Sequence, residues 1–72
     1  MDKEAQFLKA FDAYADALFK HCFFRVSDRE AAKDLVQEIF SRTWDHLAGG
    51  KEVREYRAFL YRTANNLIID FY

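Results

Sequence analysis

The sequence contains no proline, and its only two glycines, Gly49 and Gly50, are adjacent. These two residue types interrupt helices most strongly, so their scarcity favours a chain that is helical almost throughout. Hydrophobic residues make up 51% of the 72 residues and aromatic residues 18%, a composition that favours a folded domain over a disordered segment. A chain of this length forms one small domain, and its large aromatic side chains compensate for a limited buried surface.

Features of several other protein classes are also missing. The single cysteine, Cys22, cannot form an internal disulfide, which indicates a reducing compartment. No apolar run approaches the roughly 20 residues needed to cross a bilayer, and no signal-peptide pattern opens the chain. We therefore expect a cytoplasmic protein without a membrane partner. The net charge of −1 is low for a protein that binds duplex DNA on its own, since phosphate contacts need a basic face.

Hydrophobic residues recur at helical spacing in three stretches. The first runs from about Glu4 to Arg25, and one of its faces carries Phe7, Phe11, Tyr14, Leu18 and Cys22. Ser27 and Glu30 match a capping box, which predicts that a second helix begins at about Asp28. The Gly49-Gly50 pair ends this helix, because glycine readily takes the left-handed conformation that closes a helix.

The third stretch begins between Lys51 and Glu55 and continues to the end of the sequence. Its apolar residues at helical spacing are Val53, Tyr56, Leu60, Ala64, Leu67 and Phe71. The pattern is still helical at Tyr72, so we expect the natural protein to continue beyond this residue. Three helices with short connections predict an all-α fold, a small three-helix antiparallel bundle that occupies residues 1–72 as one domain.

Two segments resemble a known family. They are Asp34-Leu35-Val36-Gln37-Glu38-Ile39-Phe40, continuing to Trp44, and Ala58-Phe59-Leu60-Tyr61-Arg62-Thr63-Ala64-Asn65-Asn66, continuing to Asp70-Phe71-Tyr72. The first resembles region 2.2 of sigma-70 family proteins of the extracytoplasmic-function group, and the second resembles regions 2.3 and 2.4. The resemblance covers about Phe7 to Tyr72, in the order and spacing of the family. It implies a non-enzymatic promoter-specificity subunit of bacterial RNA polymerase, whose natural chain continues into a helix-turn-helix domain.

The second predicted helix carries an acidic ridge formed by Asp34, Gln37 and Glu38. Residues three and four apart share a helix face, so these side chains point outward together while Ile39 and Phe40 point inward. Such a ridge suits a basic helical partner. The resemblance implies that it docks on the clamp helices of the largest catalytic subunit of core RNA polymerase. The alternative interpretation is a plain solvated helix face.

The third predicted helix carries the candidate DNA-binding residues, which are Arg57, Tyr61, Arg62, Asn65 and Asn66. Aromatic rings stack on unpaired bases, arginines hold phosphates, and asparagines read base edges. The resemblance implies that this helix contacts the non-template strand of the minus-ten element, and that one unstacked base enters a pocket in the preceding loop, about His46 to Tyr56. Two alternatives stay open: partial core packing for Tyr61, and an intramolecular hydrogen bond for Asn66.

The sequence departs from the family pattern at three positions of this segment. Thr63 replaces the usual isoleucine, which is expected to loosen packing or to admit a hydrogen bond. Asn65 stands where a basic residue is common, and this removes a phosphate contact. Tyr56 stands where proline often precedes the aromatic-leucine pair.

Metal binding, a cofactor and catalysis are not expected. His21 and Cys22 are adjacent and point in different directions along a helix, so they make poor joint ligands. His46 lies near the predicted C-terminal end of a helix, where a positive charge interacts favourably with the helix dipole. The rival interpretation is a helical interaction or oligomerisation module without a DNA role, which does not explain why both family-like segments occur together. An anti-sigma factor is a further partner that the resemblance implies.

Overall fold

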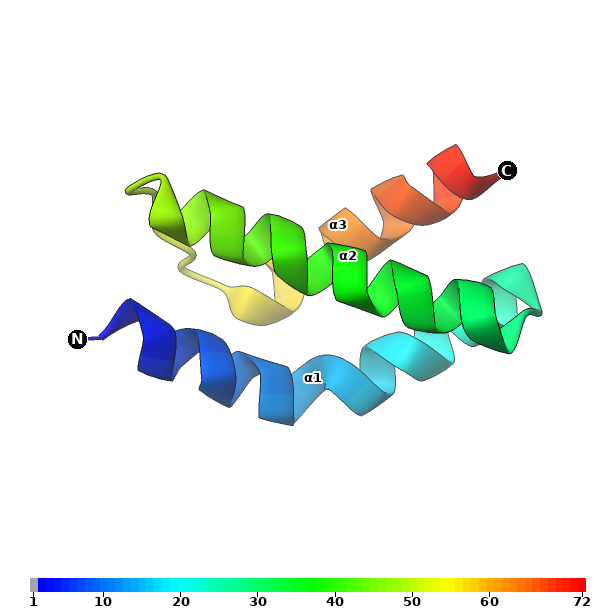
Figure 1. Cartoon of the computed structure of the whole chain (residues 1–72), viewed down its shortest axis with the longest axis horizontal. Coiled ribbons are helices and arrows are strands. Elements are labelled where there is room, and N and C mark those ends of the chain that lie inside the picture. The colour runs from blue at the N-terminus through cyan, green and yellow to red at the C-terminus, as the bar shows by residue number, and fades with distance from the viewer. Residues whose placement is uncertain (1) are drawn as a thin grey trace.

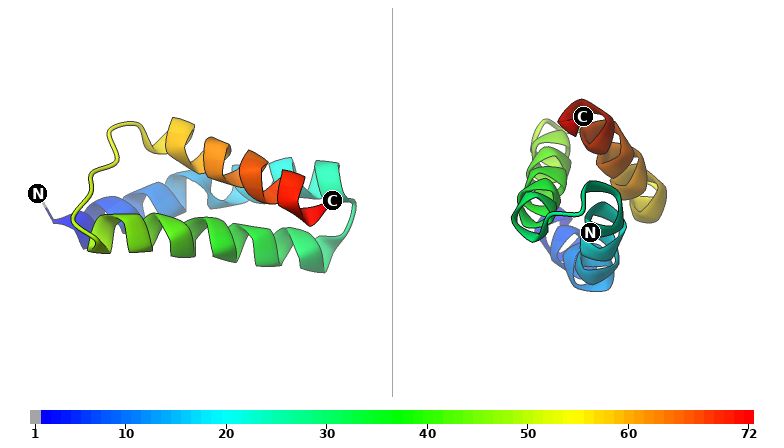
Figure 2. Two further views of the ribbon diagram at one scale, coloured as in Figure 1. Left: turned by 90° about the horizontal axis from the view of Figure 1, so that it is seen from above. Right: turned by 90° about the vertical axis from the view of Figure 1, so that its right-hand side faces the viewer.

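The computed structural model describes residues 2–72, which fold into three helices without any strand (Figure 1). They are α1 (Lys3–Val26), α2 (Arg29–Ala48) and α3 (Tyr56–Phe71). Helix α2 returns antiparallel to α1, and α3 reverses again and packs on both (Figure 2). The prediction of an all-α, three-helix antiparallel bundle is confirmed. No helix among these residues is long and apolar enough to cross a membrane.

The junction between α1 and α2 corrects one detail of the sequence-based prediction. Ser27 is not the N-cap of α2. It takes a left-handed conformation with φ of 55° and closes α1, since its N–H donates to the Phe23 carbonyl at 2.8 Å. An N-cap needs extended backbone, which Asp28 supplies, and its carboxylate accepts from the Ala31 N–H at 3.1 Å. The prediction of a capping box at Ser27 was wrong because only two residues connect the helices. Ser27 is needed to end α1, which leaves Asp28 to begin α2.

The connection between α2 and α3 also differs from the prediction. Gly50 has a φ of 89°, a left-handed conformation that glycine adopts without steric cost, and this ends α2 as expected. Helix α3 begins at Tyr56, however, so Val53 lies in the loop. The intervening residues 51–55 are not helical, and they carry the chain from the end of α2 across to the start of α3 (Figure 1).

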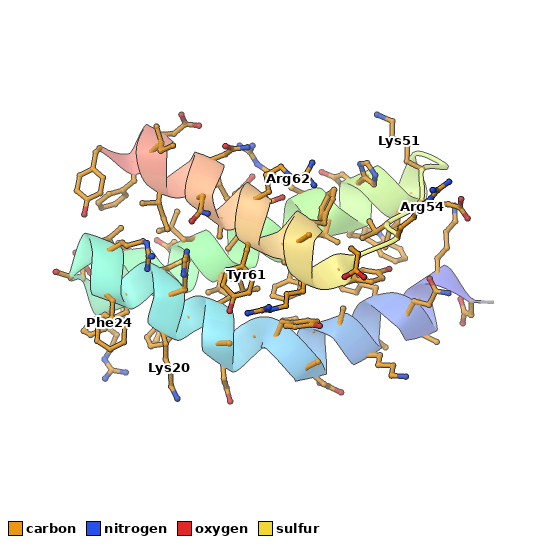
Figure 3. The ribbon with its side chains drawn as sticks, turned by 180° about the vertical axis from the view of Figure 1, so that it is seen from behind. Lys20, Phe24, Lys51, Arg54, Tyr61 and Arg62 are labelled. Carbon is orange, nitrogen blue, oxygen red and sulfur yellow. The ribbon has the colours of Figure 1, made fainter. Side chains whose placement is uncertain are left out.

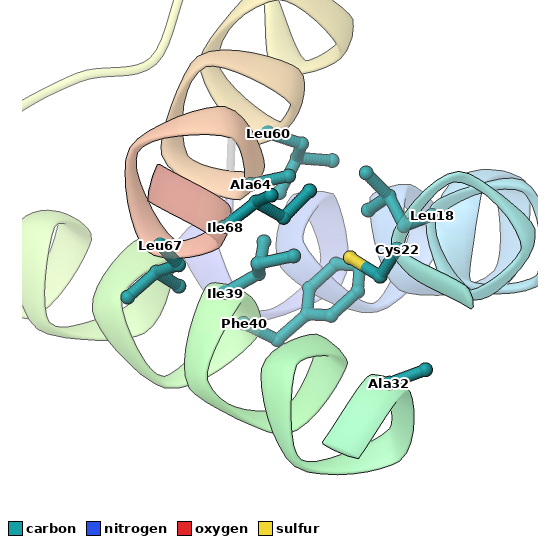
Figure 4. Packing of buried hydrophobic residues seen from close by; sticks show 9 residues of the cluster. All are labelled: Leu18, Cys22, Ala32, Ile39, Phe40, Leu60, Ala64, Leu67 and Ile68. Carbon is teal, nitrogen blue, oxygen red and sulfur yellow. The ribbon is translucent and has the colours of Figure 1, made fainter. Parts of the chain in front are cut away.

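All three helices contribute to one buried cluster (Figure 4). Its members are Leu18, Cys22, Ala32, Ile39, Phe40, Leu60, Ala64, Leu67 and Ile68. Burial of each large aliphatic or aromatic side chain stabilises the fold by about 1.5–3 kcal/mol. Thr43 is the buried polar residue beside this cluster, and its hydroxyl donates to the Ile39 carbonyl at 2.8 Å. The cluster fixes how α2 and α3 sit on α1, and hence where their outer faces point.

A second, more exposed group of aromatic rings joins the first half of α1 to α2. Phe7 packs edge-on against Phe40 and Trp44, with ring centroids 6.0 and 5.3 Å apart. The ring centroids of Phe11 and Phe40 are 4.8 Å apart. Phe11, which the periodic pattern placed on the apolar face of the first helix, keeps 42% of its surface accessible, and Trp44 keeps 38%, because both flank the α1–α2 seam.

Candidate functional site

The acidic ridge of α2 is exposed along its whole length. Asp34, Gln37 and Glu38 all face solvent, and the core residues Ile39 and Phe40 anchor the helix beneath them. Glu38 is paired with Arg42 one turn later, with Arg42 Nε 2.9 Å from Glu38 Oε2. Both side chains of this pair are about half exposed, so the pair contributes only about 0.3–0.5 kcal/mol and is readily exchanged for a partner. The ridge is therefore a charged surface on a rigid support.

The five candidate DNA-binding residues form one continuous surface of α3, which we call the α3 face: Arg57, Tyr61, Arg62, Asn65 and Asn66. Four of them are exposed, and Tyr61 is half-buried. Figure 3 shows Tyr61 between α1 and α3, and Arg62 on the outer side of α3. The partial core packing considered for Tyr61 is thus confirmed, since its ring packs against the buried cluster.

The α1 side of the α3 face is tied to His21. Asn65 Oδ1 lies 2.8 Å from His21 Nε2, and the imidazole meets the Tyr61 ring edge-on at 5.0 Å between centroids. The Arg57 guanidinium lies over the same Tyr61 ring at 5.5 Å. Sequence reasoning missed His21 as a neighbour of these residues, because 44 positions separate it from Asn65 and helical periodicity does not predict which faces of two helices meet.

The other side of the α3 face borders an open hollow of about 330 Å³ between the end of α2, the loop and α3. Its lining includes His46, Phe59 and Arg62, together with loop residues 52–55. The His46 and Phe59 rings are 4.8 Å apart, and His46 Nε2 lies 3.2 Å from the Glu52 carbonyl oxygen. The hollow is at the small end of the range of ligand pockets, about 300–1,000 Å³. Its walls combine aromatic rings with two arginines, Arg54 and Arg62, and two carboxylates, Glu52 and Glu55.

The loop before α3 carries two basic and two acidic residues, so its net charge is zero. Lys51 and Arg54 are exposed on the loop before α3 (Figure 3). Thr63, by contrast, turns inward and its hydroxyl donates to the Phe59 carbonyl at 2.8 Å. The hydrogen bond considered for Thr63 is confirmed, so this substitution removes one source of apolar packing without leaving a hydroxyl unpaired.

Tyr56, at the first turn of α3, carries a buried hydroxyl for which residues 2–72 supply no hydrogen-bond partner. Burial raises the pKa of this phenol above its ordinary value of 10.0. Burial likewise raises the pKa of the Cys22 thiol above 9.0, and the nearby Arg25 charge opposes the shift. A buried thiol with a raised pKa is a structural group, because the reactive species of cysteine is the thiolate.

Within the described residues, no three His, Cys, Asp or Glu side chains are grouped so that they could hold a metal ion. His21 and Cys22 illustrate the reason. The Cys22 side chain enters the core, whereas His21 turns toward Asn65 on α3.

Comparison with known proteins identifies the family. The sequence profile described as Sigma-70 region 2 matches residues 10–72. The chain is 36% identical over 69 residues to the ECF RNA polymerase sigma factor SigL of Mycobacterium tuberculosis, which covers 93% of this chain and 39% of that protein. It is 32% identical over 69 residues to the ECF RNA polymerase sigma factor SigW of Bacillus subtilis, covering 96% of this chain and 36% of that one.

A more distant relative is the ECF RNA polymerase sigma factor BldN of Streptomyces coelicolor, 28% identical over 67 residues that cover 92% of this chain and 25% of BldN. No solved structure matches the chain significantly. The chain belongs to the sigma-70 family, as a region 2 domain of the extracytoplasmic-function group. It spans less than two fifths of the length of these curated relatives.

Proposed function

We propose that this domain docks on core RNA polymerase and holds the opened minus-ten element of a promoter, as part of a promoter-specificity subunit. The observation that carries the proposal is the placement of both family-like segments on the surface. All three residues of the acidic ridge and four of the five residues of the α3 face are exposed. The role requires no catalytic group, since the domain contributes binding surfaces and the polymerase performs the chemistry.

The acidic ridge is the proposed polymerase contact. Its carboxylates and amide complement a basic helical partner such as the clamp helices of the largest polymerase subunit. Electrostatic complementarity of this kind gives a docking surface its register and speeds association. Because the Glu38 pair with Arg42 is already half exposed, replacing Arg42 by a cation of a basic partner would cost little desolvation at this position.

The α3 face and the adjoining hollow are the proposed contacts with the non-template strand. Arg62 lies where the two meet, so one guanidinium can hold the strand while an unstacked base enters the hollow beside the His46–Phe59 ring pair. Stacking on an aromatic ring contributes about 1–3 kcal/mol per base, which offsets the cost of unstacking that base from its neighbours. Lys51 and Arg54 can contact phosphates individually, while Glu52 and Glu55 cancel their charge over the loop as a whole. An anti-sigma factor that covers either surface would prevent initiation.

The proposal is tested by measuring binding of the chain to purified bacterial core RNA polymerase. The test variant is Gln37→Ala/Glu38→Ala, and a matched control, Asp16→Ala, removes one exposed charge from α1. We expect the double substitution to weaken docking by about thirtyfold or more, the effect of losing an interfacial charge partner, and the control to bind like the parent. Circular dichroism verifies that all three proteins are folded.

If the folded parent did not bind the polymerase, the proposal would be overturned. The domain would then be better described as a helical interaction module. The exposed apolar side chains at the end of the bundle, Phe24 and Ile69, with 77% and 71% of their surface accessible, would be the first place to look for its partner.

A further inference from the structure

His21 lies outside both family-like segments, yet it contacts the α3 face directly. It belongs to α1 and is half-buried. Its Nε2 lies 2.8 Å from Asn65 Oδ1, and its ring meets Tyr61 edge-on at an interplanar angle of 88°. Through Tyr61 it also connects to Arg57, whose guanidinium lies over the ring. Three of the five residues of the α3 face therefore form one connected set with His21.

The hydrogen bond to Asn65 fixes the orientation of the asparagine amide. An amide oxygen accepts hydrogen bonds and cannot donate them, so His21 Nε2 must carry the proton and donate it. With Oδ1 occupied in this way, the NH₂ group is the end of the Asn65 side chain that remains for a ligand. Asn65 is thereby set as a donor, suited to phosphate oxygens and to acceptor atoms on base edges such as O6 and N7 of guanine or O4 of thymine.

The contacts to Tyr61 restrict the rotamers of its side chain. The imidazole packs against the Tyr61 ring, and Arg57 covers it as a cation–π partner. A side chain that is already ordered does not lose rotamer freedom on binding, and this is equivalent to roughly two- to twelvefold in affinity per side chain. His21 thus prepares both a base-stacking ring and a hydrogen-bond donor before any DNA arrives.

We propose that His21 is a positioning residue of the DNA-binding surface, which holds Asn65 with its NH₂ group outward as a donor to the unpaired strand and holds Tyr61 beside it. This inference rests on the proposed function of the α3 face. It also accounts for Asn65 at a position where the family commonly has a basic residue. At this position a side chain that is hydrogen-bonded between α1 and α3 stands in place of a free cation. The surface loses a general attraction for phosphate and gains a hydrogen-bond donor with a fixed direction.

The test is a double-mutant cycle between His21 and Asn65. The variants are His21→Phe, which keeps an aromatic edge beside Tyr61 but loses the donor, Asn65→Ala, and the two combined. The measurement is affinity of the chain, assembled with bacterial core RNA polymerase, for the single-stranded DNA sequence that the parent complex enriches from a randomised pool. We expect each single substitution to weaken DNA binding by about fivefold, the worth of one hydrogen bond, and the double variant to be no weaker than either.

A packing role for His21 alone would give additive losses, and additivity would overturn the inference, as would unchanged DNA binding by His21→Phe. The matched control is Lys20→Ala, since Lys20 neighbours His21 on α1 and points away from α3 (Figure 3). Thermal unfolding of each variant separates loss of contact from loss of fold.

Nitrogen chemical shifts of the His21 ring in the free domain provide an independent readout. We expect a protonated Nε2, and a ring protonated on Nδ1 alone would contradict the amide orientation. If the parent complex bound no single-stranded DNA, the proposed function of the α3 face would fail together with the role of His21. A protonated Nε2 in the free domain would then identify the His21–Asn65 pair as a purely intramolecular contact, so the two failures are distinguishable.

Discussion

The acidic ridge of α2 and the α3 face are both exposed, but they are held in different ways. The ridge depends on its own helix: its only side-chain pairing among residues 2–72 is the link from Glu38 to Arg42. The α3 face depends on α1, because His21 contacts Asn65 and Tyr61. A surface that any stable α2 helix would present is therefore combined with one whose Tyr61 and Asn65 side is ordered only when α1 packs on α3.

This difference explains what each surface can do. A ridge with mobile, solvated charges suits electrostatic docking, in which the partner supplies much of the order. Recognition of unpaired bases needs rings and donors at fixed places, since stacking and hydrogen bonding depend on geometry. Substitutions that affect one surface and spare the other test whether this distinction holds.

The largest effect is expected from Leu60→Ala in the core beneath the α3 face. Leu60 is fully buried, so its truncation should destabilise the domain by about 2–5 kcal/mol. The total stability expected of 72 residues is about 4–11 kcal/mol, so the α3 face should be lost with the bundle. Urea unfolding measures this change. Ile69→Ala, at a position with 71% of its surface accessible, is the control and should leave stability nearly unchanged.

A smaller and more selective effect is expected from Arg62→Ala/Asn66→Ala. Both side chains are exposed, and residues 2–72 provide no hydrogen-bond partner for either. Their removal should reduce single-stranded DNA affinity about tenfold or more, while polymerase docking and thermal stability remain at parental values. Equal losses of DNA and polymerase binding would show that the two surfaces are not separate.

The sequence predicted most of the fold because helical periodicity depends on local residue order. It placed the ends of α1 and α2 within a residue or two, and it predicted the outward direction of Asp34, Gln37 and Glu38. The ridge is a single-helix property, so one helix is enough to predict it. Its role as a polymerase contact, like the DNA-binding role of the α3 face, stays a prediction.

What the sequence did not predict depends on how helices meet. The approach of His21 to Asn65 depends on the rotation of α1 against α3, which core packing decides. The hollow beside the His46–Phe59 ring pair likewise depends on the path of the loop. The capping residue was misassigned because Ser27 and Asp28 are both good caps locally, and only the left-handed backbone at Ser27 distinguishes them.

The reassignment of the N-cap of α2 from Ser27 to Asp28 predicts a modest change in the stability of the domain. Asp28→Ala should cost about 1 kcal/mol of stability, because the Ala31 N–H loses its acceptor. Ser27→Ala should have a clearly smaller effect, since the Ser27 cap of α1 uses backbone atoms. Thermal unfolding of the pair decides the matter, and the opposite ranking would restore Ser27 as the N-cap.

An effect of similar size and opposite sign is expected from Tyr56→Phe at the start of α3. Removing a buried hydroxyl that lacks a partner should stabilise the domain by about 1 kcal/mol. Because burial raises the pKa of Tyr56, the protonated phenol is favoured in the folded state. Below pH 10.0 Tyr56 is protonated in both the folded and the unfolded state, whereas above that value the unfolded chain ionises more readily and the domain loses stability. Urea unfolding at neutral and alkaline pH should therefore show a weaker alkaline loss in the variant, and an identical loss would contradict this.

The most direct test of two separate surfaces measures polymerase binding and single-stranded DNA binding on the same samples. The parent, Gln37→Ala/Glu38→Ala and Arg62→Ala/Asn66→Ala would each be mixed with bacterial core RNA polymerase and the enriched DNA sequence. We predict that the ridge variant loses the polymerase and the DNA together, whereas the α3 variant keeps the polymerase and loses only the DNA. Polymerase binding that is unchanged in a folded ridge variant would contradict the assignment of the acidic ridge.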